Sequence, residues 1–244
     1  RFLAEPAGKE ACKTVTQWDC GGSAMPVDLL KQVEGELGGL CTEGWGLSET
    51  SSAVATNVPS VPQKTGSVGL VLPGLELSVR GPDGECCAPG EAGELLVRGE
   101  TVMQGYWQRP DATARALDRH GFLHTGDIGY LDADGYCFII GRKDDLIIRG
   151  GQNISPRDIE EVIQQHPAIE EVAVIGLPHS ELGEMPAAFI VATAGMIVNE
   201  REILELCEKR LARYKIPSRI IVLSELPHNS TGKVLKKELR RRYV

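Results

Sequence analysis

From about Thr65 to Gly141 the sequence consists of short β-type runs separated by turn residues, and this pattern constrains the fold more than any other feature. Runs such as "LELSVR", "GELLVRG" and "LDADGYCFII" are rich in β-branched and large apolar residues. The dipeptides Asp83-Gly84 and Asp134-Gly135 are typical of hairpin turns. Many short strands at this spacing predict an antiparallel sheet or a partly closed barrel.

The segments on either side of this region have a different pattern. Before it, the sequence predicts a strand at 14–19, a glycine turn, a helix at 25–33 and a loop at 42–50. After Gly141, it predicts a helix that begins at Ser155-Pro156, two buried strands, an amphipathic helix at 199–212 and a last strand. These elements indicate a compact α+β unit of about a hundred residues at the end of the chain.

Charge and composition narrow the classes of function. The net charge of −8 over 244 residues argues against a nucleic-acid partner. The basic tail "KVLKKELRRRYV" is interpreted as the solvated face of a terminal helix. Seven cysteines form no CxxC pair, which indicates neither a zinc site nor a disulfide framework. No apolar run approaches the roughly 18 residues of a membrane span, so we expect a soluble protein of the cytoplasm or of an organelle matrix.

Three common phosphate or nucleophile motifs do not fit. The Gly232-Lys233 pair lacks the upstream glycine and the following hydroxyl residue of a Walker loop. The segment "GWGLSE" places Glu49 where a dinucleotide fingerprint needs its third glycine. Neither "GLSET" nor "GGSAM" supplies the second glycine of a serine nucleophile elbow.

An ordered set of segments carries the strongest signal. In order along the chain these are "GGSAMP", "GWGLSET", "GELLVRGETVMQGYW", "HTGD", "GRKDDLIIRGGQNISPRDIE" and "LPHNSTGKV". In this order and at these separations they resemble the AMP-forming adenylating enzymes, the superfamily that includes acyl-CoA synthetases, peptide-synthetase adenylation domains and luciferases. The resemblance covers nearly the whole chain.

The resemblance implies a mixed α+β fold in two domains. Residues 1–143 would be the C-terminal part of a large adenylate-binding domain, with an antiparallel, β-barrel-like subdomain at 65–141. Residues 144–244 would be a small, mobile α+β domain that rotates on a hinge. The chain lacks the Ser/Thr/Gly-rich loop that the family carries upstream, so we expect a fragment of a longer enzyme with poor activity of its own.

Several residues match the nucleotide site of the family. An aromatic face at Trp45 suits a purine, and the family usually has Tyr or Phe at this place. Ser48 offers a hydroxyl to a phosphate, and Glu49 offers a hard oxygen ligand to Mg²⁺. By resemblance Ser48 and Glu49 are catalytic. The remaining matches for ATP or AMP are backbone positions of the two glycine segments, namely Gly21, Gly22, Ser23, Gly44 and Gly46.

Four further positions match roles in nucleotide binding, in adenylation and in domain rotation. Asp127 corresponds to the aspartate that binds the ribose, and Arg142 to an arginine that reaches the ribose and phosphate region. Lys233 resembles the lysine that catalyses adenylation by neutralising charge at the α-phosphate. Asp144 falls at the hinge position, where an exposed acidic residue tolerates a change of backbone torsion.

The pair Gly150-Gly151 corresponds to the backbone that lines the passage for the pantetheine arm of CoA. A Cβ at Gly151 would obstruct a thin ligand there. Asp145, beside the hinge, is expected to anchor local structure.

The function implied is an ATP-dependent acyl-CoA synthetase that converts a fatty acid, ATP and CoA into acyl-CoA, AMP and diphosphate through an acyl-adenylate. A medium- or long-chain fatty acid is the favoured substrate. Two alternatives stay open. One is a ligase for an aryl or carrier-protein-linked substrate. The other is a non-catalytic remnant that acts as a binding module.

Overall fold

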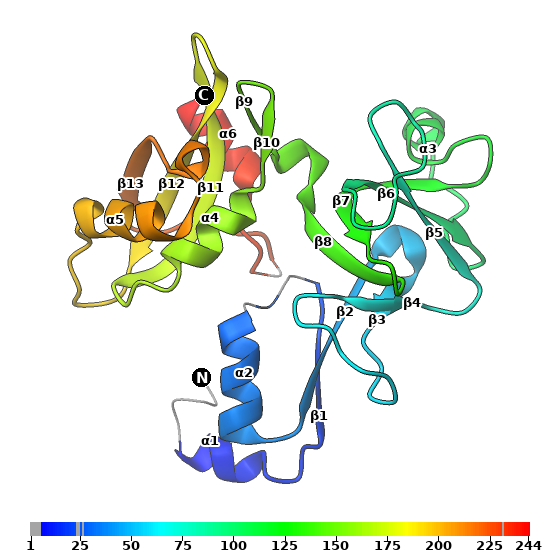
Figure 1. Cartoon of the computed structure of the whole chain (residues 1–244), viewed down its shortest axis with the longest axis horizontal. Coiled ribbons are helices and arrows are strands. Elements are labelled where there is room, and N and C mark those ends of the chain that lie inside the picture. The colour runs from blue at the N-terminus through cyan, green and yellow to red at the C-terminus, as the bar shows by residue number, and fades with distance from the viewer. Residues whose placement is uncertain (1–5, 23–24, 26, 231) are drawn as a thin grey trace. The chain divides into compact units, whose positions relative to one another are not determined.

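The computed structural model describes residues 6–22, 25, 27–230 and 232–244. It divides into two compact units, residues 1–140 and 141–244. The predicted boundary between residues 143 and 144 lies three residues further along. Each unit is mixed α/β, and Figure 1 shows its elements.

Unit 1 is built on one eight-stranded sheet in the order β1-β2-β3-β4-β8-β7-β6-β5. Its strands are β1 (Gln17–Cys20), β2 (Leu40–Leu47), β3 (Ser52–Thr56), β4 (Gly69–Val71), β5 (Leu75–Arg80), β6 (Gly93–Gly99), β7 (Leu123–Leu131) and β8 (Tyr136–Arg142). The helices are α1 (Pro6–Ala11), α2 (Val27–Leu37) and α3 (Pro110–Ala116), and a 3-10 turn, η2, covers Ser48–Thr50.

The sheet of unit 1 is open, which corrects the expectation of a barrel-like subdomain. Strands β1 and β5 lie at its two ends. Strand β1 pairs in parallel with β2, whereas β2 to β4 and β5 to β7 pair antiparallel. The strand and turn pattern predicts many short strands, but closure requires the two end strands of the sheet to pair with each other.

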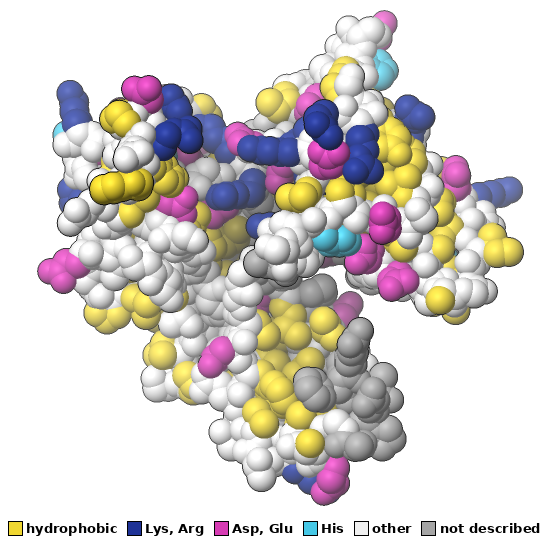
Figure 2. Space-filling view, turned by 180° about the vertical axis from the view of Figure 1, so that it is seen from behind, with side chains coloured by type: hydrophobic (Ala, Val, Ile, Leu, Met, Phe, Trp, Pro, Cys, Tyr) yellow, Lys and Arg dark blue, Asp and Glu magenta, His cyan; other side chains and the backbone are white. Residues whose placement is uncertain are grey.

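The core of unit 1 gathers between strands that are far apart in the sequence. The residues Ala55, Val68, Val79, Leu95 and Cys137 form a buried cluster, and Trp45 packs against it. Helix α2 connects the parallel strands β1 and β2 and has no buried residue among those described. Figure 2 shows exposed apolar side chains in the lower part of the view, where β1 and the helices α1 and α2 lie.

Unit 2 is a five-stranded sheet with helices on both faces. Its sheet contains β9 (Ile147–Arg149), β10 (Gln152–Ile154), β11 (Ile169–His179), β12 (Gly183–Ala192) and β13 (Arg219–Leu223). Strands β11 and β12 form a long antiparallel pair, and β13 runs parallel to β12. The helices are α4 (Pro156–Ile163), α5 (Glu200–Arg210) and α6 (Lys236–Tyr243), with 3-10 turns η3 (Lys143–Asp145) and η4 (Arg213–Lys215).

Alternation along β11 explains why both faces of this sheet are covered. Val174 packs in a cluster with Ile159 of α4 and Ile203 of α5. The neighbouring Ile175 packs in a second cluster with Leu239 of α6. Successive side chains of a strand point to opposite faces, so a continuous apolar run needs a layer on each side. In the part of the chain that the structure describes, no helix is long and apolar enough to cross a membrane.

Candidate functional site

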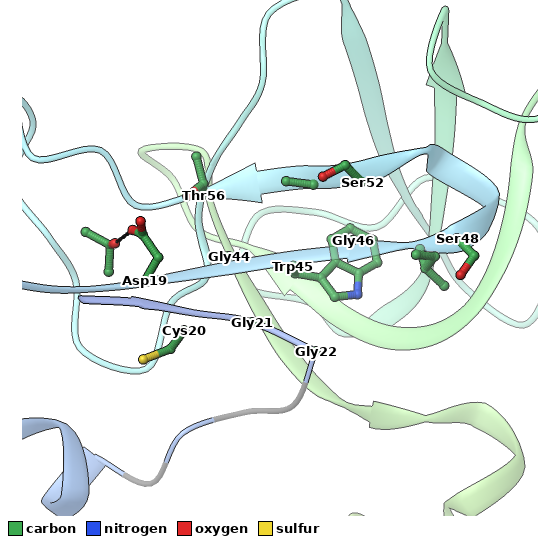
Figure 3. A pocket seen from close by; sticks show the side chains of 13 residues that line it. Asp19, Cys20, Gly21, Gly22, Gly44, Trp45, Gly46, Ser48, Ser52 and Thr56 are labelled. Atoms are coloured by element: carbon green, nitrogen blue, oxygen red, sulfur yellow. Dashed lines mark hydrogen bonds between the residues drawn. The ribbon is translucent and has the colours of Figure 1, made fainter. Parts of the chain in front are cut away.

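Unit 1 contains a pocket of about 500 Å³ beside the parallel strands β1 and β2. Figure 3 shows Asp19 and Cys20 at one end of it, Ser48 at the other end and Trp45 between them. The pocket therefore brings the two glycine-rich segments of the sequence together. Its lining consists of Asp19, Cys20, Gly21, Gly22, Thr42, Gly44, Trp45, Gly46, Leu47, Ser48, Ser52, Ala53 and Thr56.

The segment at 42–50, which was predicted to be a loop, is the end of strand β2 followed by η2. This is a correction, and its cause lies in the neighbouring strand β3. A Cβ on Gly46 would lie 2.0 Å from the carbonyl oxygen of Ser52, and one on Gly44 would lie 3.3 Å from Thr56 Oγ1. Gly46 is therefore required by the close approach of β3, which a sequence pattern alone cannot distinguish from a turn.

The side chain of Trp45 links the pocket to Asp127. The indole Nε1–H donates to Asp127 Oδ2 at 2.8 Å, from β2 to β7. Asp127 is buried, and its backbone N–H donates to Thr125 Oγ1 at 3.0 Å. The Thr125 hydroxyl in turn donates to the carbonyl of Leu95 at 2.6 Å. Two residues that the sequence assigns to the base and to the ribose are thus joined directly.

Glu49 is held by the connection between β6 and α3. The phenol of Tyr106 donates to Glu49 Oε1 at 2.8 Å, and the backbone N–H of Met103 donates to the carbonyl of Glu49 at 2.8 Å. Ser48 is exposed at the start of η2. The described residues hold no group of three or more His, Cys, Asp and Glu that could bind a metal ion. Glu49 alone fits Mg²⁺ that takes its other ligands from phosphates and water, as Mg²⁺ does in many nucleotide sites.

The first glycine segment leaves the carboxyl end of β1. Gly21 and Gly22 are exposed, and Gly22 has a φ of +81°, which glycine adopts without strain. Helix α2 begins shortly afterwards, at Val27. Ligands of α/β sheets commonly bind at the carboxyl ends of parallel strands. Ser23 lies outside the described residues.

Two polar residues of the pocket were missed by the sequence analysis. Asp19 accepts hydrogen bonds from the Thr42 hydroxyl and from Gln17 Nε2, and these two bonds hold the pKa of Asp19 below its usual value. Burial raises the pKa of the neighbouring Cys20 thiol, and the charge of Glu43 adds to this effect. Asp19 is the last residue of the predicted strand at 14–19 and Cys20 follows it, but no motif marked either residue.

Arg142 and Asp144 lie near the start of unit 2. Arg142 ends β8 and is exposed, and its carbonyl accepts from the Leu146 N–H at 3.1 Å. Asp144 is exposed in η3. Asp145 forms an ion pair with Arg240 of α6 at 3.0 Å, as expected for a residue that anchors local structure. The hinge role of Asp144 stays a prediction.

Gly150 and Gly151 form the two-residue turn between β9 and β10. Their φ angles are +55° and +79°, and a tight hairpin turn of this kind needs positive φ at both positions. A Cβ on Gly151 would meet no atom of the chain within 4 Å. Turn geometry thus accounts for both glycines, and the passage for pantetheine stays a prediction.

Lys233 lies at the end of a short turn before α6. The Asn229 backbone N–H donates to the Lys233 carbonyl at 2.9 Å, and the Lys233 N–H donates to Asn229 Oδ1 at 2.8 Å. The Lys233 side chain is exposed. The basic tail is only partly a solvated face, because Lys236 pairs with Glu160 at 2.7 Å and Leu239 is fully buried.

Comparison with known families matches both units. The family model for AMP-binding enzymes matches residues 2–107, and the model for the AMP-binding enzyme C-terminal domain matches residues 158–233. The chain belongs to the AMP-forming adenylating enzymes. Three of the six segments on which the resemblance rested lie wholly within these two matches, and "LPHNSTGKV" lies within them except for its last residue.

Individual adenylating enzymes are similar to this chain over most of its length. It is 43% identical to a 2-succinylbenzoate–CoA ligase of Geobacillus kaustophilus over 91% of this chain and 45% of that protein. It is 41% identical to a long-chain-fatty-acid–CoA ligase of Bacillus subtilis over 90% of this chain and 39% of that protein. The chain thus spans less than half the length of these curated relatives.

Solved structures of adenylating enzymes share the fold. ATP-bound MatB from Rhodopseudomonas palustris matches 99% of this chain and 48% of its own chain, with a TM-score of 0.91 and 34% identity. The anthranilate CoA ligase AuaEII in complex with anthranoyl-AMP matches 99% of this chain and 47% of its own, with a TM-score of 0.89 and 32% identity.

Proposed function

We propose that this chain supplies the adenosine pocket and the C-terminal domain of an AMP-forming acyl-CoA ligase. The observation that carries the proposal is the pocket of unit 1, in which the aromatic ring of Trp45 is hydrogen-bonded to the buried carboxylate of Asp127. A ring and a carboxylate in this arrangement suit a purine nucleoside, since the ring offers a stacking face and the carboxylate accepts ribose hydroxyls. Relatives named as CoA ligases and structures with bound ATP or acyl-AMP support the proposal.

In the first half-reaction an oxygen of the substrate carboxylate attacks the α-phosphorus of ATP, and the bond to the departing diphosphate breaks. Trp45 and Asp127 hold the adenosine part, and the Ser48 hydroxyl contacts a phosphate. Glu49 would hold Mg²⁺, and a bound Mg²⁺ would neutralise phosphate charge. The exposed ammonium of Lys233 stabilises the charge that develops on the transferring group, and loss of one such stabiliser costs about 2.7 to 4 kcal/mol.

In the second half-reaction the CoA thiolate attacks the acyl carbonyl of the adenylate, and AMP leaves. Asp144 provides the hinge about which unit 2 changes its orientation between the two steps, and the Gly150-Gly151 turn lines the path of the pantetheine arm. Arg142, the last residue of β8, contacts the ribose and phosphate region. A backbone turn without side chains leaves room for a narrow ligand.

The substrate that we propose is a medium- or long-chain fatty acid. The segments "GELLVRGETVMQGYW" and "IIRGGQNISPRDIEEVI" support this assignment, together with the relative named long-chain-fatty-acid–CoA ligase. Other relatives are named for 2-succinylbenzoate and for anthranilate, so aryl acids form the comparison set in the test.

The test measures acyl-CoA formation from ATP, Mg²⁺ and CoA with a panel of alkyl and aryl acids. It uses the product of the complete reading frame that contains these 244 residues. We expect turnover with medium- or long-chain fatty acids, accumulation of acyl-adenylate without thioester in Gly151→Leu, and wild-type behaviour in Gly195→Leu, a matched substitution at another exposed glycine of positive φ. Turnover with aryl acids alone overturns the substrate assignment. Absence of adenylate with every acid overturns the ligase and favours a non-catalytic binding module.

A further inference from the structure

The contact between Trp45 and Asp127 uses a hydrogen-bond donor that Trp45 does not need in order to stack on a purine. Stacking on a purine uses the face of the indole ring, whereas the contact with Asp127 uses the N–H on its edge. A Phe at this place would keep the face and lose the donor. A Tyr would carry its hydroxyl at a different position on the ring. The hydrogen bond therefore depends on Trp in particular.

The surroundings of the pair hold both partners in place. Trp45 packs against the buried cluster of unit 1 that includes Leu95 and Cys137, and its ring lines the pocket. Asp127 is 7% exposed, and its backbone is tied through Thr125 to the carbonyl of Leu95. Trp45 Nε1 and Asp127 Oδ2 are 2.8 Å apart, so the carboxylate lies directly beside the edge of a ring that lines the pocket.

We propose that the indole N–H of Trp45 positions the Asp127 carboxylate for the ribose, so that Trp45 determines how strongly the site distinguishes ribose from deoxyribose. This inference rests on the proposed function, because it takes the pocket to be the adenosine site. Hydrogen bonds to an ionised group are directional and stronger than neutral ones, so the N–H fixes the orientation of the carboxylate. Without the N–H, the carboxylate samples more orientations and its bond to a ribose hydroxyl weakens.

The experiment is a double-mutant cycle in which the indole N–H of Trp45 is removed from the protein and a ribose hydroxyl is removed from the ligand. Dissociation constants for AMP, 2′-deoxyAMP and 3′-deoxyAMP are measured by isothermal titration calorimetry on the product of the complete reading frame. The variants are Trp45→Phe and a chain with benzothienylalanine at position 45, in which sulfur replaces the N–H and the shape of the ring is kept. The matched control is Trp18→Phe, because the Trp18 N–H donates to the Gly38 carbonyl at 2.7 Å and Trp18 does not line the pocket.

We expect both changes at position 45 to weaken AMP binding by about tenfold, the effect of losing one hydrogen bond to a charged group. They should weaken binding of a deoxy analogue by less than about threefold, because each analogue lacks one of the hydroxyls that donate to the Asp127 carboxylate and therefore depends less on it. Trp18→Phe should leave all three constants unchanged. The ratio of ribose to deoxyribose affinity thus falls only when the N–H of Trp45 is removed.

Three results would overturn the inference. Equal weakening of all three ligands means that Trp45 contributes only its ring face, and the benzothienylalanine chain separates this result from a packing defect in Trp45→Phe. An unchanged affinity in that chain means that the N–H has no role. If the wild-type chain binds AMP no more tightly than uridine monophosphate, the adenosine pocket itself is wrong, and the proposed function fails together with the inference.

Discussion

The substitution Gly46→Ala tests the packing that shapes the floor of the pocket. The added Cβ would lie 2.0 Å from the Ser52 carbonyl oxygen and 2.7 Å from the Cα of Ala53. Both are backbone atoms and cannot rotate away. Because an ordinary contact between such atoms needs about 3.4 Å, β2 and β3 must separate locally by more than an ångström.

Overpacking of this size costs about 1 to 3 kcal/mol, and we expect the upper end because the contact is with backbone. In a unit of about 140 residues each kcal/mol lowers the midpoint of thermal unfolding by roughly 2 to 4 °C. Gly46→Ala should therefore lower the midpoint of unit 1 by about 6 to 12 °C. Gly44→Ala is the matched control, since its Cβ first meets the Thr56 hydroxyl at 3.3 Å and that side chain can rotate.

Differential scanning calorimetry of the 244-residue chain and of the two variants measures this difference. The expected order of stability is wild type, then Gly44→Ala within about 1 kcal/mol, then Gly46→Ala. A Gly46→Ala chain as stable as wild type would refute the close approach of β3, and so would a larger loss for Gly44→Ala than for Gly46→Ala.

Three further predictions concern single side chains of unit 1. Tyr106→Phe removes the hydroxyl that donates to Glu49. It should raise the Mg²⁺ concentration for half-maximal ATP binding by about three- to tenfold, as measured by Mg²⁺ titration at fixed ATP. An unchanged Mg²⁺ concentration would contradict the positioning of Glu49 by Tyr106. Burial raises the pKa of Cys137 to about 12, so its thiol should resist iodoacetamide at pH 8 until the chain unfolds, which mass spectrometry detects. The ion pair with Lys64 holds the pKa of Asp132 below its usual value. Asp132 therefore stabilises the fold fully when the pH is above the usual pKa of an aspartate, and this contribution is lost as the pH falls through the lowered pKa. The destabilisation by Lys64→Met, measured by denaturant unfolding across pH, should therefore shrink in acid, and a loss that grows in acid would contradict it.

Most of unit 2 was predicted well because its helices carry an apolar stripe and its two longest strands are continuous apolar runs. The helix predicted from Ser155 is α4, the helix predicted at 199–212 is α5, and the two apolar runs are β11 and β12. A continuous apolar run of this length fits a strand covered on both faces, which the helices of unit 2 provide. Local pattern and tertiary packing agree there, so the sequence is sufficient.

Unit 1 shows where sequence patterns are insufficient. Glycines at 44 and 46 indicated a loop, but in the structure they allow two strands to approach closely. The spacing of turns predicted many short strands, yet it could not determine whether the ends of the sheet pair. Both features depend on contacts between segments that the sequence pattern treats separately.

The sequence predicted several residues of the candidate site, but it did not predict which of them contact each other. Trp45 and Asp127 were each assigned from their own motif, but 82 positions separate them and no periodicity relates them. Asp19 was missed because it belongs to no motif, although its strand was predicted. The roles of Arg142, Asp144 and Lys233 stay predictions that experiments on the whole protein test.

The exchange of diphosphate into ATP, with and without a carboxylic acid, tests the central claim most directly. The product of the complete reading frame is compared with Lys233→Ala and with Lys237→Ala, an exposed lysine four positions along the same segment. The account predicts exchange that depends on a fatty acid, that falls roughly a hundred- to a thousand-fold in Lys233→Ala, and that is unchanged in Lys237→Ala. Exchange of equal rate in wild type and Lys233→Ala would contradict it.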